Sequence, residues 1–593
     1  MKVLKKIFSL FDKKDLKNVY FLIFLTMIMA LLETMSVIFI MPFIALASNP
    51  ELITTNDILS NIYFSLNFTS TDNFLIATGI LLVVLLIMSL AFRAIITFIQ
   101  FRFIMMQEYV LGRKLINVYL NQPYEWFLSK SSADLGKNII SEVSLVVTGI
   151  IQQFFYLVGY SFTTFTLILL LLIVKPILTI SAFLIILLVY GTIYLVVKNI
   201  LDRTSKDRHE AIGFRFKAVK EAFGSIKDLK VNALEEAYLS KFNTPSLTYA
   251  KTMSFASSIQ QLPRYALEAV AFGGIIAIMI FLIVDTGNFA DSLPVVALFA
   301  FAGYRIMPAL QGIYSSLTQL IVAKPQLDSI YSDLKNQILI EKLNLKSNFN
   351  FNDAILFENL SYKYPSSNSL AIECINLRIE KGSHVGFVGP TGSGKTTTVD
   401  IILGLLKKTS GHFSVDSNKM NSENIHKWQS DIGYVPQHIF LKDDSIASNI
   451  AFGIDENEWN LQKIKSAAKI ANLDEFIIND LKDGYDTVVG DKGSRLSGGQ
   501  KQRIGIARAL YHSPKVLILD EATSALDNIT EQKVVTAIKK MPKQVTVIMI
   551  AHRLSTIKDC DNIILFNKGK IVASGTYSKL IQESSLFKEL SRE

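Results

Sequence analysis

The chain has 593 residues, half of them hydrophobic, and its mean hydropathy is +0.35. These values exclude an ordinary soluble protein of this size and indicate a membrane protein. The net charge is +9, but no basic stretch is interleaved with aromatic residues, which argues against nucleic-acid binding. The two cysteines, Cys374 and Cys560, lack metal-type spacing and predict no disulfide in a reducing compartment.

Apolar sequence is concentrated before about residue 325, in stretches long enough to cross a bilayer as helices. The first stretch follows several lysines and ends in Ala-Leu-Ala, so a cleaved signal peptide is an alternative. Its length and the glutamate Glu33 inside it favour a membrane helix. Six spans are predicted, near residues 20–46, 74–99, 144–174, 177–199, 265–284 and 293–323.

Charge in the connecting segments sets the expected orientation. Segments 48–73 and 285–292 contain acids but no Lys or Arg, whereas 100–140 and 200–264 are rich in both. The positive-inside rule therefore places both termini in the cytoplasm, with helices two to five extending below the bilayer. Around residues 58–66 an apolar pattern at helical spacing predicts a short helix, either on the outer membrane face or packed on protein.

A glycine-rich loop lies between a predicted strand and a predicted helix. The run His384–Val388 reads as a buried strand, and Gly389–Thr396 reads Gly-Pro-Thr-Gly-Ser-Gly-Lys-Thr. Such a loop turns backbone N–H groups toward phosphate oxygens, next to a helix N-terminus. We expect Lys395 to reach the β and γ phosphates of ATP, and Thr396 to bind Mg²⁺. The predicted nucleotide contacts here are Gly389, Gly392, Ser393, Gly394, Lys395, Thr396 and Thr397.

A second apolar run, Val516–Leu519, is followed by two acids, Asp520 and Glu521. A buried strand of a parallel sheet delivers such side chains to the edge where ligands bind. Because side chains alternate along a strand, the two carboxylates are expected to have different roles. Asp520 is predicted to hold Mg²⁺, and Glu521 to accept a proton from the attacking water; a strand end with solvated acids is the alternative.

The pentapeptide Leu-Ser-Gly-Gly-Gln at 496–500 resembles the signature of ABC (ATP-binding cassette) ATPases, and the other motifs of that family follow in order. The resemblance implies that Tyr364 stacks on adenine, with Tyr362 as a weaker candidate. It implies catalytic roles for Glu521, His552 and Gln437, metal contacts from Thr396, Gln437 and Asp520, and further nucleotide contacts from Ser497, Gly498, Gly499, Gln500 and Asp527.

The same resemblance implies the architecture. We expect an all-α transmembrane domain of six helices over residues 1–325, similar to type IV ABC exporters, a linker over 326–350, and an α/β P-loop nucleotide-binding domain over 351–593. One chain carries one cassette, so two copies are expected to form a homodimer that clamps ATP between a P-loop and the partner's signature. ATP and Mg²⁺ are the implied cofactors, and segments 123–127 and 214–224 stand where exporters place coupling helices.

Ionisable residues inside the predicted spans bear on the substrate, because they are costly in lipid. Arg93, Arg264 and Arg305 are predicted to contact an anionic group, since guanidinium forks suit phosphate. Structural pairing with Glu33 and Glu268, or a role in gating at Pro308, are the alternatives.

Sequence around Glu33, Arg264 and Arg305 resembles bacterial PglK-type flippases of lipid-linked oligosaccharides. This implies a multi-pass protein of the bacterial inner membrane that flips a polyprenyl-pyrophosphate-linked oligosaccharide to the outer leaflet. Exporters of lipid A, amphipathic drugs or peptides are the alternative, and an ABC ATPase that moves nothing is disfavoured by the six spans.

Overall fold

The computed structural model describes residues 2–50, 53, 57–66, 68, 70–286, 289–335, 351–365, 367–522, 526–539, 544–551 and 553–591. Within these, the side chains of residues 2, 57, 58, 271, 278, 281–286, 289–293 and 528 are not described. The chain forms two compact units. Unit 1 contains residues 1–122 and 129–339, and unit 2 contains residues 123–128 and 340–593.

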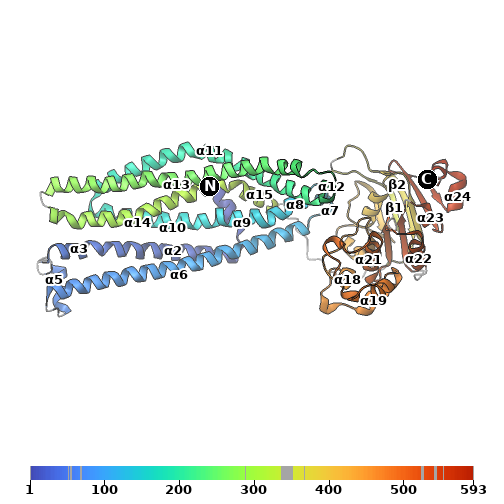
Figure 1. The fold of residues 1–593 in the computed structure, drawn as a ribbon, viewed down its shortest axis with the longest axis horizontal. Helices are drawn as coiled ribbons and strands as arrows, with labels where there is room; N and C mark the ends of the chain where they lie inside the picture. Colours follow the sequence, from blue (N-terminus) through green and yellow to red (C-terminus); the bar gives the residue numbers. More distant parts are fainter. Residues whose placement is uncertain are drawn as a thin grey trace. The chain divides into compact units, whose positions relative to one another are not determined.

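The regular secondary structure of unit 1, over its described residues, is helical throughout. Its long helices α2, α6, α10, α11, α13 and α14 run alongside one another (Figure 1), with α10 packed on α2 and α14, and α13 packed on α11 and α14. In chain order the helices are α1 (Lys2–Leu10), α2 (Lys13–Ile38), α3 (Ile40–Ser48), α5 (Asp57–Ser65), α6 (Thr71–Leu120), α8 (Ser132–Lys137), η1 (Asn138–Glu142), α9 (Val143–Val146), η2 (Val147–Ile151), α10 (Gln152–Val174), α11 (Pro176–Gly224), α12 (Ile226–Val231), α13 (Glu235–Thr286), α14 (Phe289–Val322) and α15 (Lys324–Lys335).

Five helical segments among the described residues are long and apolar enough to cross a membrane: Lys13–Ser48, Thr71–Leu120, Ser132–Val174, Pro176–Gly224 and Pro294–Val322. Each overlaps one predicted span along most of that span's length. The remaining predicted span, 265–284, falls at the end of α13, where part of the side chains lies outside the described set. At ~1.5 Å per residue the 50-residue α6 is about 75 Å long, more than twice a bilayer's hydrocarbon thickness, so it is long enough to extend beyond the bilayer.

The predicted short helix in the first outer loop is α5. Its Leu59 and Tyr63 pack with Leu46 and Phe74 of α3 and α6, whereas Phe64 on the other side is exposed. The helix therefore packs on protein through one face and keeps an apolar face turned outward. At the other end of unit 1, the first residues of the expected linker form α15, whose Leu327 and Ile330 are fully buried; residues 336–350 lie outside the description.

Unit 2 contains two sheets. A six-stranded sheet has the order β10-β9-β3-β8-β7-β6 and is parallel except for β10, and a four-stranded antiparallel sheet has the order β2-β1-β4-β5. The strands are β1 (Ala354–Tyr362), β2 (Ile372–Glu380), β3 (His384–Val388), β4 (Ser410–Val415), β5 (Asn418–Lys419), β6 (Ile432–Val435), β7 (Val516–Asp520), β8 (Thr546–Ile550), β9 (Asn562–Asn567) and β10 (Lys570–Gly575).

Strands β7 and β8 are buried along their whole length, as expected for a parallel sheet covered on both faces. The covering and flanking helices are α7 (Tyr124–Leu128), α16 (Lys395–Ile402), α17 (Ile425–Gln429), α18 (Ile446–Ile450), α19 (Leu461–Ile470), α20 (Asp474–Asn479), α21 (Gly498–Tyr511), α22 (Asn528–Lys539), α23 (Leu554–Ile557), α24 (Tyr577–Glu583) and α25 (Ser585–Leu590). The predicted α/β architecture is confirmed.

Candidate nucleotide site and membrane cavity

The glycine-rich loop Gly389–Thr396, the predicted P-loop, connects β3 to α16. Its expected position between a strand and a helix is therefore present. Gly389 approaches β9 so closely that a Cβ there would lie 2.1 Å from the Phe566 carbonyl oxygen. Gly394 caps α16 with φ of 103°, a left-handed conformation that favours glycine. Gly392, with φ of 76°, is exposed and has open space around its α-carbon. Gly389 thus leaves no room for a side chain, while the left-handed backbone at Gly392 and Gly394 favours glycine.

Side chains of the loop fit a bound phosphate chain. Lys395 Nζ lies inside the loop, donating to the carbonyl oxygens of Gly389 at 2.6 Å and Pro390 at 3.0 Å. Burial lowers its pKa. Ser393 Oγ is buried and, among the described residues, has no hydrogen-bond partner. A lysine ammonium and an unsatisfied hydroxyl beside a helix N-terminus are groups that a nucleotide triphosphate satisfies.

Thr396 and Thr397 occupy the first turn of α16 but differ in environment. Thr396 is exposed, so it is accessible to a metal ion that binds together with the nucleotide. Thr397 is buried, and its hydroxyl lies 3.1 Å from the hydroxyl of Tyr364, so either oxygen can donate. This hydrogen bond ties the expected adenine-binding residue to the P-loop helix.

Of the two tyrosines considered for adenine, only Tyr364 has an accessible ring. Tyr362 is 1% exposed, and its hydroxyl donates to Glu125 Oε1 of α7 at 3.0 Å. The two rings meet edge to face with centroids 4.9 Å apart. Tyr362 therefore supports Tyr364 and connects it to α7, the short helix that the sequence marked as a coupling segment.

The two acids lie at the carboxyl end of β7, and Glu521 is close to Gln437. Asp520 is the last strand residue and accepts from the Tyr434 hydroxyl at 3.5 Å. Glu521 lies just beyond the strand with φ of 50° and accepts from Gln437 Nε2 at 2.6 Å. Strand alternation alone therefore does not separate the two carboxylates, because the left-handed backbone at Glu521 redirects its side chain.

The signature segment forms the start of α21. Ser497 is the N-cap, and its hydroxyl accepts a hydrogen bond from the backbone N–H of Gln500 at 3.3 Å. In return, the side-chain Oε1 of Gln500 accepts from the backbone N–H of Ser497 at 2.7 Å. Gly498 and Gly499 are the first two residues of the helix. Sequence analysis missed this reciprocal cap, although a serine three residues before a glutamine is its known signal. The cap holds the first-turn N–H groups in place at the helix terminus.

Asp527 and His552 are the remaining residues predicted for the nucleotide site, the first as a nucleotide contact and the second as a catalytic residue. Asp527 is exposed and accepts from the Thr530 amide at 2.9 Å, which lowers the pKa of its carboxyl. It is therefore placed at the start of α22. His552 and residues 523–525 lie outside the described residues.

Sequence analysis also missed an acid in α16. Burial, together with the charge of Asp520, raises the pKa of Asp400 to about 6. Burial and the charges of these two acids also raise the pKa of Tyr434. No motif marks Asp400; its position, one helical turn after Thr396, is the only signal.

The predicted Mg²⁺ set, Thr396, Gln437 and Asp520, contains one carboxylate. In the described part of the chain no three His, Cys, Asp or Glu residues gather as a metal cluster. One carboxylate is what Mg²⁺ needs when phosphate oxygens and water fill its other positions. The residues thus fit a metal that arrives with a nucleotide.

Unit 1 contains a cavity of about 560 Å³ between α2, α6, α10 and α14. Its charged lining residues are Glu33, Arg93 and Arg305. Arg93 Nη1 lies 2.9 Å and Arg305 Nη1 3.9 Å from the same oxygen, Glu33 Oε1. Glu33 is 5% exposed at its side chain and Arg93 is 43% exposed. The geometry brings two of the three predicted arginines together around one buried carboxylate.

Arg264 is not among the residues that line this cavity. It pairs instead with Glu268 on the same helix, at 2.7 Å.

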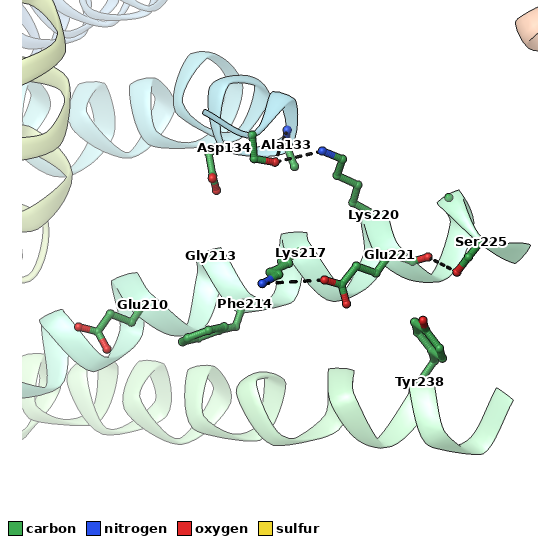
Figure 2. A pocket seen from close by; sticks show the side chains of 12 residues that line it. Ala133, Asp134, Glu210, Gly213, Phe214, Lys217, Lys220, Glu221, Ser225 and Tyr238 are labelled. Carbon is green, nitrogen blue, oxygen red and sulfur yellow. Dashed lines mark hydrogen bonds and ion pairs between the residues drawn. The ribbon is translucent and has the colours of Figure 1, made fainter. Parts of the chain in front are cut away.

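A further hollow of about 700 Å³ lies between the ends of α8, α11 and α13 (Figure 2), where Lys220 donates to Ser131 Oγ at 3.0 Å and Lys217 pairs with Glu221 at 3.9 Å. The predicted coupling stretch 214–224 is the end of α11, and the short connecting helix is α12, a few residues later.

Family models of ABC transporters match both units of the chain. The family model of the ABC transporter transmembrane region matches residues 24–307, and that of the ABC transporter matches residues 372–524. An ATP-dependent lipid A-core flippase from Ralstonia nicotianae is 29% identical over 490 residues, 81% of either chain. Multidrug resistance protein 1 of Entamoeba histolytica is 42% identical over 248 residues, which are 41% of this chain and 19% of that protein.

A solved bacterial Atm1-family ABC exporter with ATP bound superposes with a TM-score of 0.81 at 20% identity, over 98% of both chains. The likeness shows the type IV exporter fold. Fold and site define a multi-pass membrane transporter of the ABC class that couples ATP hydrolysis to translocation. The chain is an ABC exporter half-transporter, with one transmembrane region and one ATP-binding cassette.

Proposed function

We propose that this exporter flips a polyprenyl-pyrophosphate-linked oligosaccharide from the inner to the outer leaflet of a bacterial inner membrane, as a homodimer with cytoplasmic cassettes. The observation that carries the proposal is the membrane cavity. Two guanidinium groups share one carboxylate there, so its charged lining has a net charge of +1. An unbalanced cation inside a membrane is costly, and an anionic headgroup balances it.

Bidentate geometry favours a phosphate or pyrophosphate as that headgroup, since the planar guanidinium fork matches two phosphate oxygens. Arg93 supports this role because it is only half-buried and can turn from Glu33 to a ligand. Arg264, which the sequence grouped with it, is already paired and lies outside the cavity lining, so we leave it out of the proposed site.

A homodimer is supported by the surface of the α11–α12–α13 connection. Phe223 is 73% and Val231 77% exposed, and Ile226 beside them is also exposed. Exposed apolar residues clustered in a cytoplasmic loop indicate a protein interface. In the proposed dimer α12 docks on the partner's cassette, while each P-loop faces the partner's signature segment with ATP and Mg²⁺ between them.

A second candidate function is export of lipid A or of amphipathic drugs. Relatives named lipid A-core flippases cover most of the chain, and the cavity lining also holds the aromatic residues Phe155, Tyr156, Tyr160 and Tyr304. Rings suit an amphipathic guest, whereas the arginines suit an anionic one. The headgroup that stimulates ATP hydrolysis separates these candidates.

The test uses the full-length protein in proteoliposomes with a polyprenyl-pyrophosphate oligosaccharide, lipid A or a cationic amphipathic drug. We expect the first to give the largest stimulation of ATPase activity and to be flipped. Arg93→Gln and Arg305→Gln should each reduce stimulation and flipping at least tenfold with basal ATPase preserved, whereas Arg264→Gln should reduce them much less. Equal effects of all three substitutions, or a larger stimulation by lipid A or by the drug than by the polyprenyl-pyrophosphate oligosaccharide, would contradict the proposal.

A further inference from the structure

A second hollow in unit 1 lies on the far side of α14 from the charged cavity. It is a crevice of about 110 Å³ between α10, α11, α13 and α14, helices that pack side by side (Figure 1). Its lining is apolar apart from Thr179, whose hydroxyl already donates to the Lys175 carbonyl oxygen of its own helix at 2.8 Å. The described lining of the crevice therefore offers no unsatisfied polar side chain.

One stretch of α14 separates the two spaces. Tyr304, Arg305, Pro308 and Ala309 line the charged cavity, whereas Gly303, Ile306, Met307 and Leu310 line the crevice. This alternation is that of opposite faces of an α-helix. A single molecule in contact with both faces would have one polar and one apolar part.

Glycines keep the crevice open. Gly274 of α13 and Gly303 of α14 both line it, and a Cβ added at either position meets no atom of the described residues within 4 Å. Gly303 also precedes Tyr304, so the open space reaches the border between the two faces. Apolar cavities of about this size stay dry and accept apolar guests.

The crevice lies within the membrane spans. Phe183 lies about 10 Å along α11 from Pro176, and Met307 about 20 Å along α14 from Pro294, taking ~1.5 Å per residue. Both distances start at the predicted outer ends of these helices. Hydrocarbon chains are therefore the surrounding medium, and water is not a competing occupant.

We propose that the crevice between α10, α11, α13 and α14 holds a segment of the hydrocarbon chain of the transported lipid, whose anionic headgroup occupies the Arg93–Arg305 cavity. This inference rests on the proposed function. Bilayer lipids compete for any apolar crevice, because burial there gains little over the membrane itself. A headgroup held on the other face of α14 raises the local concentration of its own chain, which gives that chain the advantage.

The experiment is photo-cross-linking of the full-length protein in phosphatidylcholine nanodiscs. The probe is a polyprenyl pyrophosphate with a diazirine in its chain, and labelled peptides are mapped by mass spectrometry. We expect label near Phe183 and Met307, reduced at least fivefold by Gly274→Leu and by Gly303→Leu, which fill the open space. Gly273→Leu is the matched control, because Gly273 also has open space but does not line the crevice.

Two further measurements distinguish the chain of the transported lipid from the acyl chains of bilayer lipids as the occupant of the crevice. Arg305→Gln should also reduce labelling, and a phosphatidylcholine with a diazirine in its acyl chain should label the crevice weakly in every variant. Labelling that survives both leucine substitutions, or that is unchanged in Arg305→Gln, overturns the inference. If in that case the polyprenyl pyrophosphate still stimulates ATPase activity in an Arg305-dependent way, the proposed function stands. Gly274→Ala and Gly303→Ala serve if the leucine variants do not fold, with a smaller loss expected.

Discussion

At the scale of single residues, the site depends on the backbone immediately after β7. Glu521 has a left-handed φ of 50°, uncommon for a residue with a Cβ, and its carboxylate is held by Gln437 Nε2. Such conformations are maintained where the surrounding structure fixes them, often at functional sites. We propose that this pair positions the attacking water, with Glu521 as general base.

Glu521→Gln is expected to lower ATP hydrolysis by about 10²–10⁴, the range for loss of a general base, while Mg²⁺-ATP still binds. Single-turnover ATPase assays and nucleotide-binding measurements check this. Glu458→Gln, at an exposed acid of the same unit, is the control and should hydrolyse at the native rate. Undiminished hydrolysis by the Glu521 variant would assign the base to another group.

Asp400 predicts a pH dependence of stability. Its native pKa of about 6 lies above the ordinary value of 3.8, because burial and Asp520 disfavour the charged form. The stability contributed by its protonated form is therefore complete below about pH 4 and is lost as the pH rises through 6. Asp400→Asn, which stays neutral, should melt higher than the native protein at pH 7.5 and by a smaller margin at pH 5, where part of the penalty is already present, with roughly 2–4 °C for each kcal/mol.

Intrinsic fluorescence measures this in the full-length protein, because its three tryptophans, Trp126, Trp428 and Trp459, all belong to unit 2. Trp428 is the most direct reporter, since its indole N–H donates to the Ile402 carbonyl oxygen at the end of α16. Asp443→Asn is the exposed control. A melting difference that does not change between the two pH values would reject this role of Asp400.

At the scale of elements, α7 joins the cassette fold although it lies between two helices of unit 1 in the sequence. Glu125 Oε1 accepts from the Tyr362 hydroxyl at 3.0 Å and from the Lys407 amide at 3.2 Å. Tyr362 packs edge to face on Tyr364, which is bonded to Thr397 of the P-loop helix. A continuous chain of contacts thus leads from the expected adenine position to the coupling segment.

Glu125→Ala is expected to reduce substrate-stimulated ATPase activity several-fold and to change the basal rate much less. The reason is that it removes the link and no group of the nucleotide site itself. Tyr362→Phe should have a similar effect. A double-mutant cycle then tests the link: the two changes should be non-additive by about 0.5–3 kcal/mol in the stability of unit 2, as for residues in contact. Strict additivity would show that the hydrogen bond carries no coupling.

At the scale of the whole molecule, the proposal requires each ATP site to be shared by two chains. A cross-subunit site predicts complementation between two inactive variants. Lys395→Ala disables the P-loop of one chain, and Ser497→Arg disables the signature segment of the other. In the mixed dimer both defects fall in one site, and the other site is intact.

Co-expressed with two different affinity tags and purified through both, the mixed dimer should recover up to half of the native ATPase activity. Each homodimer should be inactive. Absence of recovery in a correctly assembled mixed dimer would indicate that each chain binds ATP with its own signature segment, and the shared site would be abandoned.

Much of the site was predictable because its motifs specify local geometry. A glycine-rich loop between a strand and a helix has one well-defined conformation, and Lys395 and Ser393 lie where that pattern predicts. Asp400 and Glu125 were not identified, because their roles arise from neighbours far away in the sequence. The pairing of Arg93 and Arg305 through Glu33 was only one alternative among three, since helix rotation is not encoded in a hydropathy pattern.

The sequence by itself determined five membrane spans and the cassette, because hydrophobic length and loop chemistry act locally along the chain. Only the tertiary structure decided which charged residues share a cavity, which tyrosine has an accessible ring, and which fold α7 joins. Those outcomes depend on packing between segments up to a few hundred residues apart, where the space left by each side chain determines which neighbours it contacts.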